Sequence, residues 1–181
     1  MGAITEDSPQ VMAAGETDSA APGRADGDVE LLVQLLKLSS LINGPMLDGV
    51  AAPNDLALNE LRIALCLGGE GPLAGHDIAD IMGLAPMNVS RALASLQQRG
   101  WIEAVDDPAN RRRKPFRLSV LGWECHQALL PDLAGVASFL LGKLTPRERT
   151  SMLHNATKLT DRMADWLEIH HAGLRVRHST G

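Results

Sequence analysis

The sequence of 181 residues predicts a mainly α-helical fold that carries one small β-hairpin. Apolar residues recur at helical spacing in several segments between residues 29 and 171. The stretch from Phe116 to Val120 instead alternates apolar and polar side chains, as half-buried strands do. Glycine and proline stand between these segments and mark the ends of separate elements. We therefore expect one domain, residues 29–181, after a short leader.

Residues 1–28 are expected to form a disordered acidic leader, because they are mostly small or acidic and include few bulky apolar side chains. Up to Glu30 the chain has seven acidic residues and one basic residue, and after it 15 acidic and 16 basic residues. The net charge of −5 therefore belongs to the leader and does not exclude a polyanionic partner. No apolar run has the length of a signal peptide or a membrane span, which favours a cytoplasmic protein without membrane contact.

Two helices are expected before residue 70. Asp28 is a suitable N-cap for a first helix over residues 28–42, which Asn43-Gly44-Pro45 would stop. A second, short helix covers residues 58–67 and would end at the Gly68-Gly69 pair. The first helix has a broad apolar face made of Leu31, Leu32, Leu35, Leu36, Leu38 and Ile42.

A helix-turn-helix is predicted between residues 73 and 100. The segment 73–83 has the pattern of a short helix, and Gly83-Leu84 breaks it. Pro86 begins the next helix, where its missing N–H is harmless, and Gly100 follows the end of that helix. Its apolar residues recur at i, i+3, i+4 and i+7 and are expected to be buried: Val89, Ala92, Leu93 and Leu96. In motifs of this kind the second helix enters the major groove of DNA.

The segment after Gly100 predicts a β-hairpin with a cationic tip. A short apolar run at residues 101–105 precedes a turn at 106–110, and the alternating residues Phe116, Leu118 and Val120 follow. The tip has four consecutive positive charges, Arg111, Arg112, Arg113 and Lys114. Such a cluster on a chain of negative net charge indicates a polyanion, most often a nucleic-acid backbone. A merely solvated loop is the alternative.

Two further helices complete the chain. One is expected from Gly122 to about Leu141 with a kink at Pro131, and the last opens with a capping box at Thr145-Pro146-Arg147-Glu148. The last helix has an apolar face made of Met152, Leu153, Ala156, Leu159, Met163, Trp166 and Leu167. The first and last helices are too apolar to be solvated on every side. We therefore expect them to pack against each other and against a second subunit.

From about Leu58 to Asp165 the chain resembles the MarR family of winged-helix transcriptional regulators. The resemblance is carried by VSRALASLQQRGWI at residues 89–102, DPANRR at 107–112 and RLSVLG at 117–122. Asn110 stands where the family commonly has aspartate, and Ser119 stands where it has threonine.

The resemblance implies a winged helix-turn-helix with N- and C-terminal dimerisation helices. The DNA-binding lobe would cover residues 58–121, and the dimerisation helices would cover 29–57 and 122–171. It further implies an obligate homodimer that binds a palindromic operator in double-stranded DNA, usually as a repressor. A small effector, often an aromatic acid, would bind between the dimerisation helices and the lobe and release the DNA.

The DNA-contacting residues are expected on the exposed face of the second helix of the motif and in the hairpin loop. Residues near the start of that helix would reach base edges, while the basic loop would lie along the minor groove and the phosphates. The candidates are Pro86, Met87, Asn88, Ser90, Arg91, Ser95, Arg111, Arg112, Arg113 and Lys114.

An effector pocket is expected among the first helix, the helix at 58–67 and the start of the helix at 122. Its polar candidates, among the apolar residues Leu36, Met46 and Cys66, are Ser39, Asn43, Asn59, Arg62 and His126. Arg62 is a cation with apolar neighbours on its helix, which favours a partly buried anion such as an aromatic carboxylate or its thioester. An ion pair with Asp55, Glu60 or an acid of the partner helix is the alternative.

Other chemistries have less support in the sequence. Cys66 and Cys125 sit in apolar helical contexts and are expected to be small buried hydrophobes. The C-terminal histidines lack an acid or cysteine at ligand spacing, so neither a metal nor another cofactor is expected. No phosphate-binding loop or nucleophile–base pair indicates an enzyme. The alternatives are a redox- or metal-responsive regulator of the same fold and a winged helix used only for protein interaction. The latter has no need for four consecutive basic residues.

Overall fold

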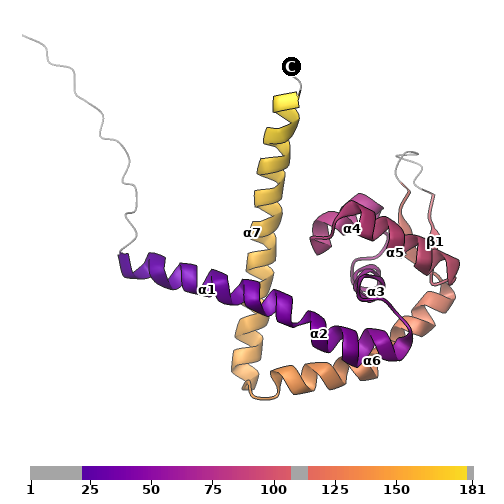
Figure 1. The fold of residues 1–181 in the computed structure, drawn as a ribbon, viewed down its shortest axis with the longest axis horizontal. Helices are drawn as coiled ribbons and strands as arrows, with labels where there is room; N and C mark the ends of the chain where they lie inside the picture. Colours follow the sequence, from indigo (N-terminus) through magenta and orange to yellow (C-terminus); the bar gives the residue numbers. More distant parts are fainter. Residues whose placement is uncertain (1–21, 107–113, 179–181) are drawn as a thin grey trace, which may run out of the picture. The chain divides into compact units, whose positions relative to one another are not determined.

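The computed structural model describes residues 22–106 and 114–178 and shows a mainly helical protein with a two-stranded sheet (Figure 1). The chain divides into two compact units, Met1–Ser40 and Leu41–Gly181. The predicted fold class, helices with a single β-hairpin, is confirmed for the described residues. The disorder predicted for the leader lies outside them up to residue 21.

Helix α1 spans Pro22–Leu41 and begins before the expected start. The prediction that Asp28 caps this helix is wrong, because Asp28 lies inside it. The boundary between the leader and the first helix, expected at residue 28, is therefore at residue 22. Proline is favourable at the first helical position, where a backbone N–H has no helical partner. Several large apolar side chains of α1 are exposed: Val29, Leu31, Leu32, Val33, Leu36, Leu38 and Leu41.

Helix α1 ends within one residue of the expected Ile42, but Asn43-Gly44-Pro45 is itself helical, contrary to the expectation. Helix α2 (Asn43–Met46), the π-helical η1 (Leu47–Ala51) and the 3-10 helix η2 (Ala52–Asn54) follow one another directly. Pro45 lies in the first turn of α2, where its missing N–H costs no helical hydrogen bond. The path ends at Asp55, which has a left-handed φ of 54°.

Helix α3 spans Leu58–Glu70 and includes the Gly68-Gly69 pair that was expected to end it. The helix ends instead at Gly71, which has a φ of 85°. Gly68 lies directly against the imidazole of His126 in α6 (Val120–Leu141), and a Cβ at this position would overlap the ring. Gly68 therefore permits close packing of two helices and does not act as a stop.

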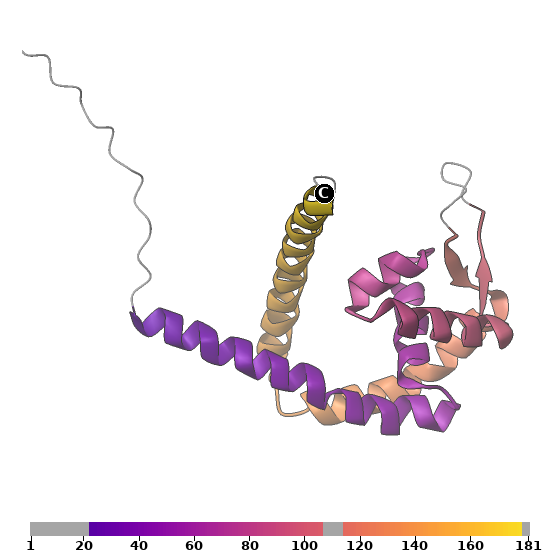
Figure 2. The same cartoon turned by 45° about the horizontal axis from the view of Figure 1, so that its top comes forward.

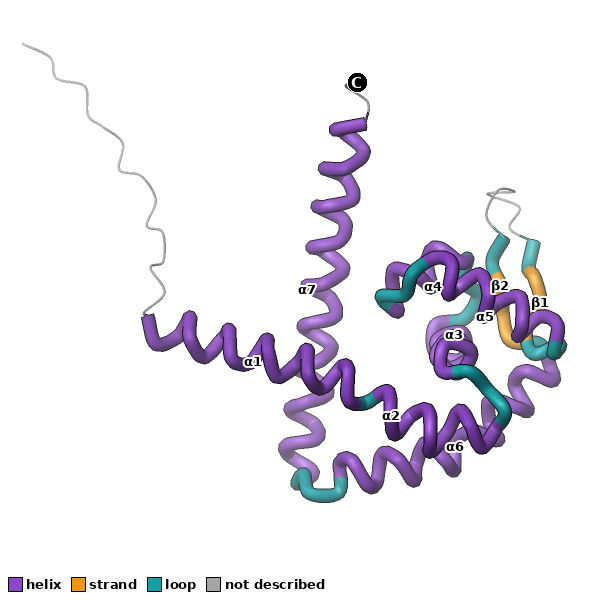
Figure 3. The backbone as a smooth tube through the Cα atoms, viewed as in Figure 1, coloured by secondary structure: helices purple, strands orange, loops and turns teal. Residues whose placement is uncertain are grey.

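The predicted helix-turn-helix is present as α4 (Gly75–Met82) and α5 (Pro86–Gln98). Gly83, with a φ of 60°, ends α4, and Gly100, with a φ of 74°, follows α5; glycine adopts both conformations without strain. The apolar face predicted for α5 is buried in a core shared with η1, α3, α4, α6 and the hairpin. Figure 3 shows α3, α4, α5 and the two strands gathered together. The large side chains that are almost fully buried there are Val50, Leu61, Ile63, Leu67, Ile78, Val89, Leu96 and Leu129.

The predicted hairpin is confirmed as β1 (Ile102–Ala104) paired antiparallel with β2 (Phe116–Leu118). Leu73 forms a bridge to Phe116 through two backbone hydrogen bonds of 2.8 and 3.0 Å, which ties the sheet to the start of α4. The alternation ends at Leu118, contrary to the expectation for Val120. Val120 is 80% exposed and is the first residue of α6.

Helix α6 begins two residues before the expected Gly122, because Ser119 caps it and its Oγ accepts a hydrogen bond from the Gly122 N–H at 2.9 Å. Pro131 lies inside α6, as expected.

Helix α7 spans Pro146–His178 and opens with the predicted capping box. The Thr145 N–H donates to Glu148 Oε2 at 2.7 Å, and the Glu148 N–H donates to Thr145 Oγ1 at 3.3 Å. Hydrogen bonds from the backbone and then the hydroxyl of Thr145 lower the pKa of Glu148. The described side chains of α7 are all exposed, including Met152, Leu153, Leu159, Met163 and Trp166. Within the described residues, no single helix has both the length and the apolarity of a membrane span.

Candidate nucleic-acid interface

The outward face of α5 is determined by the buried one. Because Val89, Ala92, Leu93 and Leu96 face the core, the predicted DNA-contacting residues of this helix lie on its surface. Pro86, Met87, Asn88, Ser90 and Arg91 are all exposed, and Ser95 is half-buried at the edge of the face. Met87 is 65% exposed, which is unusual for a large apolar side chain. No acidic residue occurs in Pro86–Gln98, so this helix carries no charge that would repel a phosphate.

The hairpin lies beside α5 in both views of the fold (Figure 1 and Figure 2). Its strands are joined by a cross-strand ion pair, in which Arg117 donates from Nε and Nη2 to Glu103 Oε1, each at 2.7 Å. The Val105 N–H donates to the Pro115 carbonyl at 2.8 Å and closes the base of the loop. Lys114 is exposed at the end of that base. The other three predicted cations, Arg111, Arg112 and Arg113, lie outside the described residues.

Ser119 joins the end of α5, the hairpin and α6. Its hydroxyl donates to the Gly100 carbonyl at 2.6 Å and accepts from the Gly122 N–H at 2.9 Å, while its own N–H donates to the Trp101 carbonyl at 2.9 Å. Gly122 lies so close to the Trp101 carbonyl that a Cβ would overlap it. The RLSVLG segment therefore determines where the wing stands relative to α5. Sequence reasoning identified this segment as a motif and did not identify its role as a joint.

The five predicted effector residues belong to four elements, α1, α2, α3 and α6. Arg62 is half-buried on α3 and forms no ion pair with the described residues. The alternative partners named for it are engaged elsewhere, because Asp55 pairs with Arg99 at 3.4 Å and Glu60 accepts from the Ala57 N–H. An ion pair with an acid of a partner subunit stays a prediction.

The other four residues are on different elements. Ser39 is on α1, where its hydroxyl donates to the Leu36 carbonyl, while Asn43 is on α2 and Asn59 on α3. His126 meets α3 at Gly68, and its ring lies edge-on to Trp123 with ring centres 5.5 Å apart. The His126 Nδ1 is buried without a partner among the described residues.

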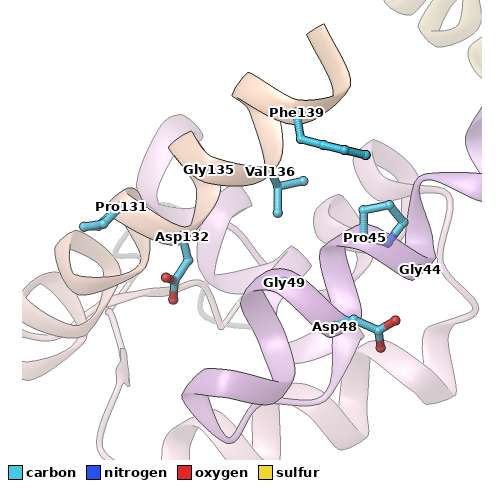
Figure 4. Close-up of a pocket in the computed structure, with 9 residues that line it drawn as sticks. All are labelled: Gly44, Pro45, Asp48, Gly49, Pro131, Asp132, Gly135, Val136 and Phe139. Atoms are coloured by element: carbon cyan, nitrogen blue, oxygen red, sulfur yellow. The ribbon is translucent and has the colours of Figure 1, made fainter. Parts of the chain in front are cut away.

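A different groove, of about 620 Å³, lies between α2–η1 and α6 (Figure 4). Phe139 and Val136 of α6 face Pro45 and Gly49 across it. Its polar side chains are two carboxylates, Asp48 and Asp132, and none of its described lining residues is a cation. Asn54 holds Asp132 through a hydrogen bond of 2.8 Å. The only signal of this groove in the sequence is its run of small residues, which by itself predicts nothing specific.

Both cysteines are free thiols; Cys66 is buried, as predicted, whereas Cys125 is only half-buried, contrary to the expectation. Burial raises the pKa of the Cys66 thiol, and the charge of Glu70 raises it further. Burial and then the nearby Glu124 raise the pKa of Cys125 in the same way. A raised thiol pKa means less thiolate at neutral pH, which argues against a reactive thiol at either position and favours the packing role predicted for Cys66. No cluster of three or more possible metal ligands occurs within the described residues.

Residues 54–113 match the model of the MarR family. A MarR-family regulator from Rhodococcus sp. RHA1 has a TM-score of 0.63 and 15% identity, over 78% of this chain and 98% of that one. PcaV from Streptomyces coelicolor, solved with its natural ligand, has a TM-score of 0.55 and 21% identity, over 83% and 98%. BpsR from Bordetella bronchiseptica, whose DNA binding is regulated by 6-hydroxynicotinic acid, has a TM-score of 0.59 and 18% identity, over 72% and 98%. At these identities the likeness shows a shared fold. A comparison with curated proteins gave no match.

Proposed function

From the match of residues 54–113 to the model of the MarR family, we infer that this protein is a ligand-responsive transcriptional repressor that binds a palindromic operator as a homodimer in the cytoplasm. The observation that carries the proposal is the exposed, acid-free face of α5 beside the hairpin on one lobe. In this proposal α5 enters the major groove and the wing lies along the adjacent minor groove. The wing supplies affinity, and the start of α5 supplies sequence choice.

The exposed apolar faces of α1 and α7 support the dimer. Large apolar side chains in rows along a helix are costly in water, and a second subunit is the usual cover for them. A two-fold dimer presents two recognition helices, whose spacing must match successive major grooves about 34 Å apart. An effector that binds a dimer with another spacing would release the DNA by shifting the population of dimer conformations.

The test is a selection of binding sequences from a random duplex library, with the mass of the protein and of its complex measured by light scattering. We expect a palindrome whose half-sites are one helical turn apart, bound by two chains. A monomeric complex, or the recovery of no enriched sequence, would contradict the proposal. The second outcome would instead favour a winged helix that binds only other proteins.

Asn88 should be a base-reading residue, because its amide is exposed in the first turn of α5 and could pair with the edge of adenine. Asn88→Ala is expected to cost about 1–3 kcal/mol on the selected operator and much less on random DNA. Arg91→Ala is the comparison. If Arg91 holds a phosphate, this substitution should weaken binding to the operator and to random DNA alike. Equal losses on both duplexes for Asn88→Ala would make Asn88 a backbone contact.

We propose an aromatic carboxylate or its thioester as the effector, with Arg62 as its ionic partner. The half-buried guanidinium has no acidic partner among the described residues, and the regulation of BpsR by 6-hydroxynicotinic acid sets a precedent for the ligand class. The groove between α2–η1 and α6 fits this class less well, because its two carboxylates would repel an anion.

Arg62→Ala should therefore leave operator binding intact and abolish release by the acid. Calorimetric titration of a panel of aromatic acids against the wild type and this variant measures the loss. Asp48→Asn is the matched control, because it neutralises a carboxylate of the groove and should leave acid binding at Arg62 unchanged. Unaltered acid binding by Arg62→Ala would remove Arg62 from the site, and the absence of binding by any acid would exclude the ligand class.

A further inference from the structure

A hollow of about 390 Å³ lies along one flank of α5, between the start of α4 and strand β2. Its floor is apolar and is made of Val89, Leu93 and Phe116. Its polar rim is made of His76, Ser90 and Gln97. None of the described residues that line it carries a permanent charge. Of these rim residues, sequence reasoning identified Ser90 alone as a DNA contact.

The hollow follows the helix for most of its length. It is lined at positions 86, 90 and 97, which lie on one side of α5 and span about 16 Å along the helix axis. Met87 and Arg91 lie on the next stripe of the helix, because Met87 is about 100° around the axis from position 86 and Arg91 is about 100° from position 90. The base-reading face and the hollow are therefore adjacent stripes of one helix.

The position of the hollow relative to DNA follows from the proposed function. With α5 in the major groove and the wing along the neighbouring minor groove, one sugar–phosphate strand must pass between the two elements. The hollow lies between α5 and β2, on the path of that strand. We propose that the hollow seats this strand, with His76 and Gln97 donating hydrogen bonds to its phosphates and Phe116 contacting its sugars. This inference depends on the proposed function.

The chemistry of the rim suits a phosphate. The Gln97 amide and the His76 imidazole can both donate to an anionic oxygen. The side chain of His76 is 71% exposed, so it can reach a strand that lies over the rim. Its Nε2 is 3.1 Å from Asp77 Oδ1, and the other oxygen of Asp77 accepts from the Ala74 N–H at 2.9 Å. The Asp77 carboxylate is therefore held by the first turn of α4 and in turn orients the His76 ring.

The first arm of the test uses Gln97→Ala, with Gln98→Ala as the matched control, because Gln98 is the next residue and does not line the hollow. Backbone phosphates of the selected operator are ethylated one at a time, and the effect on binding is measured for each protein. In the wild type we expect ethylation between the major- and minor-groove contacts to block binding. That block should weaken in Gln97→Ala and persist in Gln98→Ala. Gln97→Ala should also lower affinity for operator and random DNA alike, by roughly tenfold.

The second arm uses the N–H donors of His76. His76→Ala removes them, so the ethylation block should weaken as it does in Gln97→Ala. His76→Gln keeps a side-chain N–H donor at this position and should retain most of the block. Circular dichroism checks that each variant is folded.

Three outcomes would overturn the inference. One is an ethylation pattern that Gln97→Ala and His76→Ala both share with the wild type. Another is a small aromatic acid that Gln97→Ala no longer binds although its DNA affinity is normal, which would make the hollow a ligand site. The last is a wild type that binds no duplex, and only this outcome would also remove the proposed function.

Discussion

Replacing Arg111, Arg112, Arg113 and Lys114 together by glutamine should weaken binding to operator and random DNA alike by orders of magnitude. Each cation that neutralises a phosphate releases condensed counterions, so the log–log salt slope should flatten by up to about one unit for each phosphate that is no longer neutralised. A dimer has two wings, so the substitutions remove phosphate contacts from both half-sites of every complex. The measurement is fluorescence anisotropy of labelled duplexes between low and moderate salt.

The control removes the same charge from elsewhere on the chain. Lys143, Arg147, Arg149 and Lys158 are exposed and lie outside the winged-helix lobe. Replacing all four of them by glutamine changes the net charge equally, but it should change the salt slope far less. If the two quadruple variants were weakened equally, the effect would come from overall charge, and the wing would have no specific contact with the duplex.

The helix-turn-helix could be predicted because its signals are local. The apolar face of α5 repeats within eight residues, and Gly83 and Gly100 adopt the left-handed conformations that glycine favours at helix ends. The capping box at Thr145 and Glu148 is local in the same sense, and its hydrogen bonds are present. Patterns of this kind depend only on neighbours within about one helical turn.

Two of the failed predictions, at Gly68-Gly69 and at Asn43-Gly44-Pro45, concern residues whose role is set by distant parts of the chain. The Gly68-Gly69 pair has the local pattern of a helix stop, but both residues lie inside α3. Position 68 suits a glycine because the ring of His126 in α6 occupies the space that a Cβ would fill. Asn43-Gly44-Pro45 likewise resembles a stop, yet the path continues to Val50 and Ala51, which are buried in the core. Burial of those two residues outweighs the weak local preference for a turn.

The candidate site shows the same division. The exposed residues of α5 follow from its period, whereas the hollow needs His76, Gln97 and Phe116 to come together from three elements. The predicted effector residues lie on helices that were expected to meet, and His126 of α6 does lie against α3, at Gly68. The sequence pattern shows which face of a helix is exposed or buried, but it does not show which helix faces come together to form a cavity.

Gly122→Ala should be the most destabilising single substitution proposed for this chain. A Cβ at Gly122 would overlap the carbonyl of Trp101, and that carbonyl is held in place because it accepts the Ser119 N–H at 2.9 Å. Neither backbone can move without breaking the bonds that join Gly100, Ser119 and the start of α6. Overlap with backbone cannot be relieved by a rotamer change, so we expect a loss of about 3–5 kcal/mol in the free energy of unfolding.

Urea denaturation at matched protein concentration measures this loss, and Gly69→Ala is the control. Gly69 is also a helical glycine, but nothing lies within 4 Å of the Cβ it would gain. Its substitution should therefore raise stability by up to about 1 kcal/mol through helix propensity. Because the same joint positions the wing, any Gly122→Ala protein that stays folded should also bind DNA more weakly, with a flatter salt slope than the wild type. If Gly122→Ala unfolded within about 0.5 kcal/mol of the wild type, the close approach to Trp101 would not exist in solution, and α6 would not hold the wing in the way the structure indicates.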